Sequence, residues 1–172
     1  RKAMAKYIKE NDPYKNLVVL HTHAVPEEQD LYLEPMLGDQ YLDGPSLQTH
    51  SPDLIHSITN KWITKSQKAN KNWVVNQDEI GPARHKVLWG NLMAGGAGVE
   101  WYFGYKFAHN DLNCEDWRSR DKLWEQTKYA LDFFNDYLPF HDMQSADDLT
   151  DNLDDYVFAK NQSVYAIYLP KV

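Results

Sequence analysis

The residues of this sequence that could do chemistry follow short runs of apolar residues. The stretch NWVVNQDEIG, residues 72–81, places two adjacent carboxylates, Asp78 and Glu79, shortly after Trp73-Val74-Val75. Carboxylates act as nucleophiles and as proton donors or acceptors in enzymes. The turn signal Gly81-Pro82 comes directly afterwards. We therefore predict a buried strand whose working end carries Asp78 and Glu79.

Three further apolar runs also lead into polar or aromatic side chains. Residues 16–24, NLVVLHTHA, contain His21 and His23 near their end, and residues 43–51, DGPSLQTHS, contain Gln48 and His50. Residues 97–105, AGVEWYFGY, contain Glu100, Trp101, Tyr102 and Tyr105. In parallel α/β proteins the catalytic groups lie at the carboxyl ends of the strands. We therefore expect these four polar groups to meet at one rim of the sheet.

Carboxylates with aromatic neighbours are typical of carbohydrate sites. The chain has six Trp and eleven Tyr residues, more than a core of this size normally needs. Aromatic faces stack on the C–H surfaces of sugars, while carboxylates attack the anomeric carbon or protonate the leaving oxygen. From the residues alone, Asp78 and Glu79 could also be turn acids or a helix cap, and Glu100 could support a basic side chain.

Helical and strand-like patterns alternate through most of the chain. The first pattern, residues 1–8, is already helical, so we read the chain as a piece of a longer protein. Further helical spacing covers residues 52–68, 84–94 and 118–137, strand-like runs cover residues 16–24, 43–51, 73–81 and 97–105, and residues 26–35 read as an acidic loop. This alternation predicts an α/β fold with a parallel sheet.

The end of the chain has a different pattern. Leu138-Pro139 ends the last helix, and residues 155–170, DYVFAKNQSVYAIYLP, form two alternating apolar runs around residues 160–163. That pattern predicts a β-hairpin. We place a domain boundary near residue 140, with the α/β domain in residues 1–140 and the start of a β-sandwich in residues 141–172.

Composition argues against several classes of protein. The formal net charge of −7 and the absence of a Lys/Arg cluster argue against a nucleic-acid binder. No apolar run approaches the roughly 20 residues that a membrane-spanning helix needs. Cys114 is the only cysteine, so the chain has neither an internal disulfide nor a cysteine-based metal site.

Four stretches resemble the C-terminal part of bacterial (β/α)8-barrel glycoside hydrolases of the clan-A type, in which a small β-sandwich follows the barrel. They are NWVVNQDEIG, RHKVLWGNLMAGGAGVEWYFGY, NDLNCEDWRSRDKLWEQTKYALDFF and DYVFAKNQSVYAIYLP. The resemblance extends from about residue 16 onward. It implies that the four strands are strands five to eight of a TIM barrel, that an N-terminal half completes it, and that the protein is secreted or lies in the periplasm or at the cell surface.

The resemblance also implies a mechanism and roles for the residues of the rim. Glu79 would be the nucleophile of a retaining double displacement, and an acid from the end of the fourth strand, upstream of this chain, would lie about 5–5.5 Å away. His21, His23, Gln48 and His50 would line the floor of the sugar subsite, and Asp78 would hydrogen-bond its neighbours. Glu100, Trp101, Tyr102 and Tyr105 would form a wall, with Trp101 as the stacking platform. The mechanism requires neither a metal nor a cofactor.

Two other functions fit parts of the same pattern. His21 and His23 at the end of a barrel strand could bind a metal, as in amidohydrolases, with His50 and an acid as further ligands. A carbohydrate-binding barrel without catalytic activity would share the aromatic residues but would not need a closely spaced pair of acids.

Overall fold

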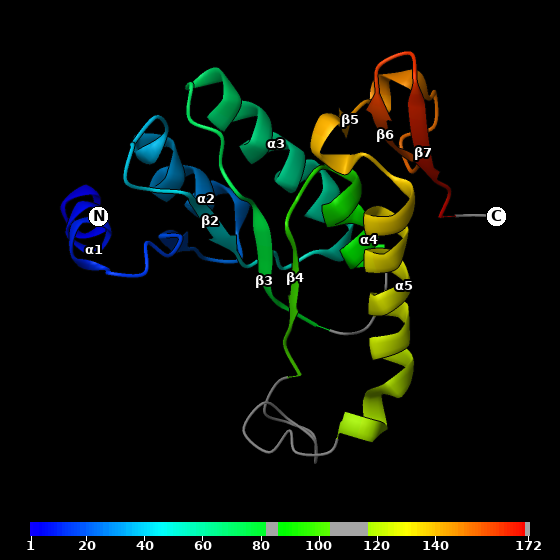
Figure 1. The fold of residues 1–172 in the computed structure, drawn as a ribbon, viewed down its shortest axis with the longest axis horizontal. Helices are drawn as coiled ribbons and strands as arrows, with labels where there is room; N and C mark the ends of the chain where they lie inside the picture. Colours follow the sequence, from blue (N-terminus) through cyan, green and yellow to red (C-terminus); the bar gives the residue numbers. More distant parts are fainter. Residues whose placement is uncertain (82–85, 104–116, 171–172) are drawn as a thin grey trace.

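The computed structural model describes residues 1–81, 86–103 and 117–170. This part of the chain folds into a four-stranded parallel sheet and a three-stranded antiparallel sheet, with helices packed between and around them (Figure 1). The prediction of an α/β fold with a parallel sheet is therefore confirmed. None of the helices in the described ranges is long and apolar enough to cross a membrane.

The parallel sheet has its strands in sequence order, β1-β2-β3-β4. Their bounds are β1 Val19–His21, β2 Gly44–Leu47, β3 Asn76–Ile80 and β4 Gly98–Trp101. Within the described residues the sheet is open, with β1 and β4 at its edges. The antiparallel sheet has the order β5-β6-β7, with β5 Gln144–Ser145, β6 Tyr156–Lys160 and β7 Val164–Tyr168.

Within the described ranges, five α-helices and several short 3₁₀ segments precede or connect these strands. The α-helices are α1 Lys2–Asn11, α2 Pro26–Leu33, α3 Ile55–Lys68, α4 Lys86–Met93 and α5 Asp121–Tyr137. The 3₁₀ segments are Glu34–Met36, Pro52–Leu54, Trp117–Arg120, Phe140–Asp142 and Asp147–Leu149. Most of the predicted helices and strands are present, with shorter bounds for the strands.

The prediction of an acidic loop over residues 26–35 was wrong, because α2 covers most of it. Pro26 lies at the start of the helix, where its missing N–H costs nothing, and Glu27 and Glu28 favour the positive end of the helix dipole. The buried face consists of Gln29 and Leu33. Because only one of these two residues is apolar, the sequence lacks the periodicity that normally reveals a helix.

The two faces of the parallel sheet differ in character. Side chains that point to the first face, such as Leu47 and Val75, pack with Leu33, Ile58 and Trp62 under α2 and α3. Side chains alternate along a strand, so the residues between them point the other way. Val19 of β1 points there and is 44% exposed. We call this second side of the four-stranded sheet the open face.

The C-terminal sheet is packed directly on the helices. The predicted hairpin is confirmed by antiparallel pairing of β6 with β7. Phe158 and Ala166 of the hairpin share an apolar cluster with Leu88 of α4 and with Ala130 and Phe134 of α5. Figure 1 shows the antiparallel sheet beside these two helices. The residues on either side of position 140 therefore contribute to one continuous core.

Candidate functional site

The acids Asp78 and Glu79 lie near the end of β3, with Ile80 as the last residue of the strand. Gln77 pairs with Val99, and Ile80 pairs with Trp101, so that Asp78 and Glu79 together stand opposite the single residue Glu100. This two-against-one arrangement is a β-bulge. Glu79 has φ +59°, in the left-handed region that residues other than glycine seldom adopt.

The bulge turns both acids to the open face. In a regular strand, neighbouring side chains point to opposite sides. Here Gln77 and Ile80 are both buried, whereas Asp78 and Glu79 both contact His21 of β1. The Nδ1 atom of His21 lies 3.3 Å from Oδ2 of Asp78, and its Nε2 atom lies 3.7 Å from Oε2 of Glu79. One imidazole therefore faces both carboxylates.

Asp78 is the best connected of these groups. The hydroxyl of Ser46, on β2, donates to Oδ2 of Asp78 and lies 3.4 Å from Nδ1 of His21. Burial alone would raise the pKa of Asp78, but hydrogen bonds from Ser46 and from the Glu100 carboxyl, together with the His21 imidazole, hold that pKa below its ordinary value. Asp78 is therefore ionised near neutral pH.

The four strands thus bring together residues far apart in the sequence. His21, Ser46, Asp78, Glu79 and Glu100 come from β1, β2, β3 and β4. The side chain of His21 is 52% exposed, that of Glu79 35% and that of Asp78 23%. A solvent-accessible carboxylate beside a more buried, fixed carboxylate is an arrangement that could serve catalysis at a bound substrate.

Trp101 does not lie in this cluster, so the expectation that it forms the stacking wall was wrong. It packs against Ile55, Ile80 and Val87 on the helix-covered side of the sheet. Its indole N–H donates to the hydroxyl of Thr127 in α5 at 3.2 Å. Strand alternation explains the difference, because Trp101 directly follows Glu100, which points to the open face.

The other rim residues lie around the cluster or apart from it. The ring of His23 stacks on Tyr32, with centroids 5.4 Å apart, and its Nδ1 atom lies 3.4 Å from Oε2 of Glu28. The backbone N–H of His50 donates to the carbonyl of Ala24, and the N–H of Tyr102 donates to that of Ile80. Gln48 is partly buried. Tyr105 lies outside the described residues.

Sequence reasoning missed two residues that organise this rim. Gln29 of α2 is 1% exposed, and its side-chain amide donates to the carbonyl oxygens of His23 and Gln48, at 3.2 and 2.9 Å. It therefore ties the ends of β1 and β2 together. Ser46 is the second missed residue. Its signal was available, since it lies two positions before Gln48 and so shares its side of the strand.

The two histidines proposed as metal ligands do not converge. His21 faces Asp78 and Glu79, whereas His23 faces Glu28 and Tyr32. In the part of the chain that the structure describes, no group of three or more His, Cys, Asp or Glu side chains is arranged to hold a metal ion. The described geometry therefore gives no support to the amidohydrolase alternative.

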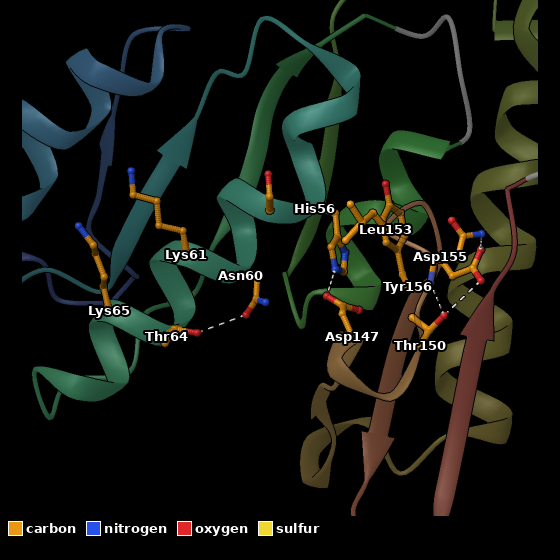
Figure 2. Close-up of a pocket in the computed structure, with 12 residues that line it drawn as sticks. His56, Asn60, Lys61, Thr64, Lys65, Asp147, Thr150, Leu153, Asp155 and Tyr156 are labelled. Atoms are coloured by element: carbon orange, nitrogen blue, oxygen red, sulfur yellow. Dashed lines mark hydrogen bonds and ion pairs between the residues drawn. The ribbon is translucent and has the colours of Figure 1, made fainter.

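A separate hollow of about 510 Å³ lies between α3 and the segment before β6 (Figure 2). At its floor, His56 is stacked on Tyr156, with Nδ1 2.9 Å from the Gly90 carbonyl oxygen and Nε2 2.7 Å from Oδ2 of Asp147. Lys61 at its edge is paired with Asp30. Because these side chains already satisfy one another, we interpret the hollow as part of the packing between α3 and the C-terminal sheet.

Comparison of the chain with protein-family models, with curated proteins and with solved structures gave no match. The functional argument therefore depends on the geometry of the open-face cluster and on the sequence motifs described above.

Proposed function

We propose that the protein is a glycoside hydrolase that acts on a polysaccharide or oligosaccharide, with Glu79 as the nucleophile of a retaining double displacement. The observation that carries this proposal is the bulge in β3, which turns Glu79 to the open face beside His21. Bulges in strands are over-represented next to active sites, where they redirect a side chain. The position of Glu79 also agrees with the sequence resemblance to clan-A enzymes.

The cluster favours Glu79 over Asp78 for this role. Asp78 already accepts hydrogen bonds from Ser46 and Glu100 and lies beside His21. Glu79 has His21 at 3.7 Å, which is longer than a hydrogen bond and leaves its oxygens able to reach a sugar. In this mechanism Glu79 attacks the anomeric carbon while a second acid protonates the departing oxygen, and water then hydrolyses the glycosyl-enzyme.

We further propose that the parallel sheet is the second half of a (β/α)8 barrel. Four parallel strands in sequence order, with helices on one face and a polar open face, are what strands five to eight of a barrel would present. The remaining strands would pair with the edges β1 and β4 and enclose the cluster. The proton donor would then come from the end of the fourth barrel strand, and the enzyme would act outside the cytoplasm on its substrate.

The test is the Glu79→Gln variant of the full-length protein, assayed on a panel of plant and bacterial glycans. Glutamine keeps the size of the side chain but is not a nucleophile, so we expect kcat to fall by at least about 10³-fold. Glu10→Gln is the matched control, because Glu10 is a surface acid of α1 paired only with Lys6 in the described structure. Equal activity of the Glu79 variant and the control would refute the assignment.

A further inference from the structure

The hydrogen-bonding capacity of Asp78 is already used within the protein. Its Oδ2 atom accepts from the Ser46 hydroxyl and lies 3.3 Å from Nδ1 of His21, and its carboxylate also accepts from Glu100. Ser46 itself is only 5% exposed. A carboxylate has about four lone-pair positions, and three are directed at these groups. Asp78 therefore has little capacity left for a sugar hydroxyl.

The imidazole of His21 transmits the position of Asp78 to Glu79. An ionised carboxylate only accepts hydrogen bonds, so the contact with Asp78 favours a proton on the Nδ1 atom of His21. A proton on Nδ1 fixes which way the ring faces, and its Nε2 atom is then directed at Oε2 of Glu79, 3.7 Å away. At this separation the ring lies beside the Glu79 carboxylate and limits where it can lie, without binding it in a hydrogen bond.

We propose that Asp78 is a positioning residue that acts through His21 on Glu79, and that it neither binds the sugar nor attacks it. The chain of contacts runs from Ser46 to Asp78, from Asp78 to His21, and from His21 to Glu79. This inference rests on the proposed function for its effect on catalysis. Its structural content, the protonated Nδ1 of His21 held by Asp78, does not depend on that function.

The first experiment measures His21 directly by ¹⁵N NMR of the histidine-labelled full-length protein, assigned with a His21→Gln variant. We expect Nδ1 of His21 to carry a proton in the unmodified protein, and we expect this signal to shift in Asp78→Asn. An unprotonated Nδ1, or a signal that Asp78→Asn leaves unchanged, would overturn the proposal whatever the protein catalyses.

The second experiment is a double-mutant cycle on the hydrolytic reaction. Asp78→Asn should lower kcat by about 10- to 100-fold with little change in KM, since Asp78 makes no contact with the sugar, and His21→Gln should lower kcat by a similar factor. Because both residues act through one chain, the double variant should lose little more than either single variant. Ser46→Ala should show a smaller loss of the same kind.

The two proposals fail in different ways. If Asp78→Asn raises KM and leaves kcat unchanged, Asp78 binds substrate and the positioning role is wrong, while the hydrolase remains. If Glu79→Gln is as active as Glu10→Gln, the proposed nucleophile is wrong, although the NMR result for His21 still stands. Thermal unfolding of each variant identifies any loss of activity that follows from loss of the fold.

Discussion

The left-handed backbone of Glu79 allows a test of the bulge that does not need a substrate. Glu79 has φ +59°, a conformation that costs a residue with a side chain about 1–2 kcal/mol and costs glycine almost nothing. Glycine in turn loses about 0.5–1 kcal/mol because its unfolded chain is more flexible. The difference predicts that Glu79→Gly is more stable than a variant that keeps a side chain there.

The comparison that isolates this backbone effect is Glu79→Gly against Glu79→Gln. Both variants lose the negative charge of Glu79, so any charge interaction with His21 cancels from the difference between their free energies of unfolding. We expect Glu79→Gly to be more stable by about 0.5–1 kcal/mol, which corresponds to a Tm higher by about 1–4 °C for a domain of this size. Calorimetric or fluorescence-monitored unfolding of the two variants measures it, and both should be inactive.

Gln162 provides a matched control for this pair. It has φ +57°, is exposed, and lies in the turn between β6 and β7, far along the chain from the cluster. Gln162→Gly should gain about the same stability and keep full activity. The reasoning would be refuted if Gln162→Gly were stabilised while Glu79→Gly were less stable than Glu79→Gln, because Glu79 would then not have a left-handed backbone in solution.

Three further predictions follow from the contacts described above. Burial alone would raise the pKa of Asp147, but hydrogen bonds from His56, the Val157 N–H and Ser145 hold that pKa below its ordinary value. The ionised Asp147 should therefore stabilise the fold above about pH 4, and this stabilisation should be lost as the pH falls below that value. Asp147→Asn should flatten this acid dependence in denaturant unfolding measured at several pH values. Gln29→Leu removes the side-chain donor from two partly buried carbonyl oxygens, so it should cost about 1–3 kcal/mol in chemical denaturation, and Gln29→Glu should cost at least as much. The negative charges of Asp78 and Glu79 on the open face should disfavour a negatively charged uronic acid. The kcat/KM for an aryl uronide should therefore be at least about 100-fold below that for the matched neutral glycoside, and equal values would contradict this prediction.

Much of the fold could be read from the sequence because the patterns there are local. Ile55, Ile58 and Trp62 recur at helical spacing, and all three are buried residues of α3. The alternating apolar residues on either side of positions 160–163 predicted the hairpin that β6 and β7 form. Helix α2 was missed because its buried face depends on Gln29, which is held there by hydrogen bonds to two strand ends.

The candidate site could be read only in part, because a bulge changes which side chains share a face. The sequence identified His21, Asp78, Glu79 and Glu100 as members of one rim, and the structure brings these four together. It did not show that two neighbouring acids would point the same way, or that Trp101 would point to the helices. One inserted residue in a strand pair reverses the direction of all side chains beyond it.

The shared core of the C-terminal sheet limits how this protein can be divided. Phe158 and Ala166 fill the same apolar cluster as Leu88 and Phe134, and His56 is joined to Asp147 across the same contact. A truncation after residue 140 would expose that cluster to water and leave the imidazole without its carboxylate. The antiparallel sheet is thus part of the scaffold that supports α3 and α4, and it could not be removed or grafted onto another protein as an independent module.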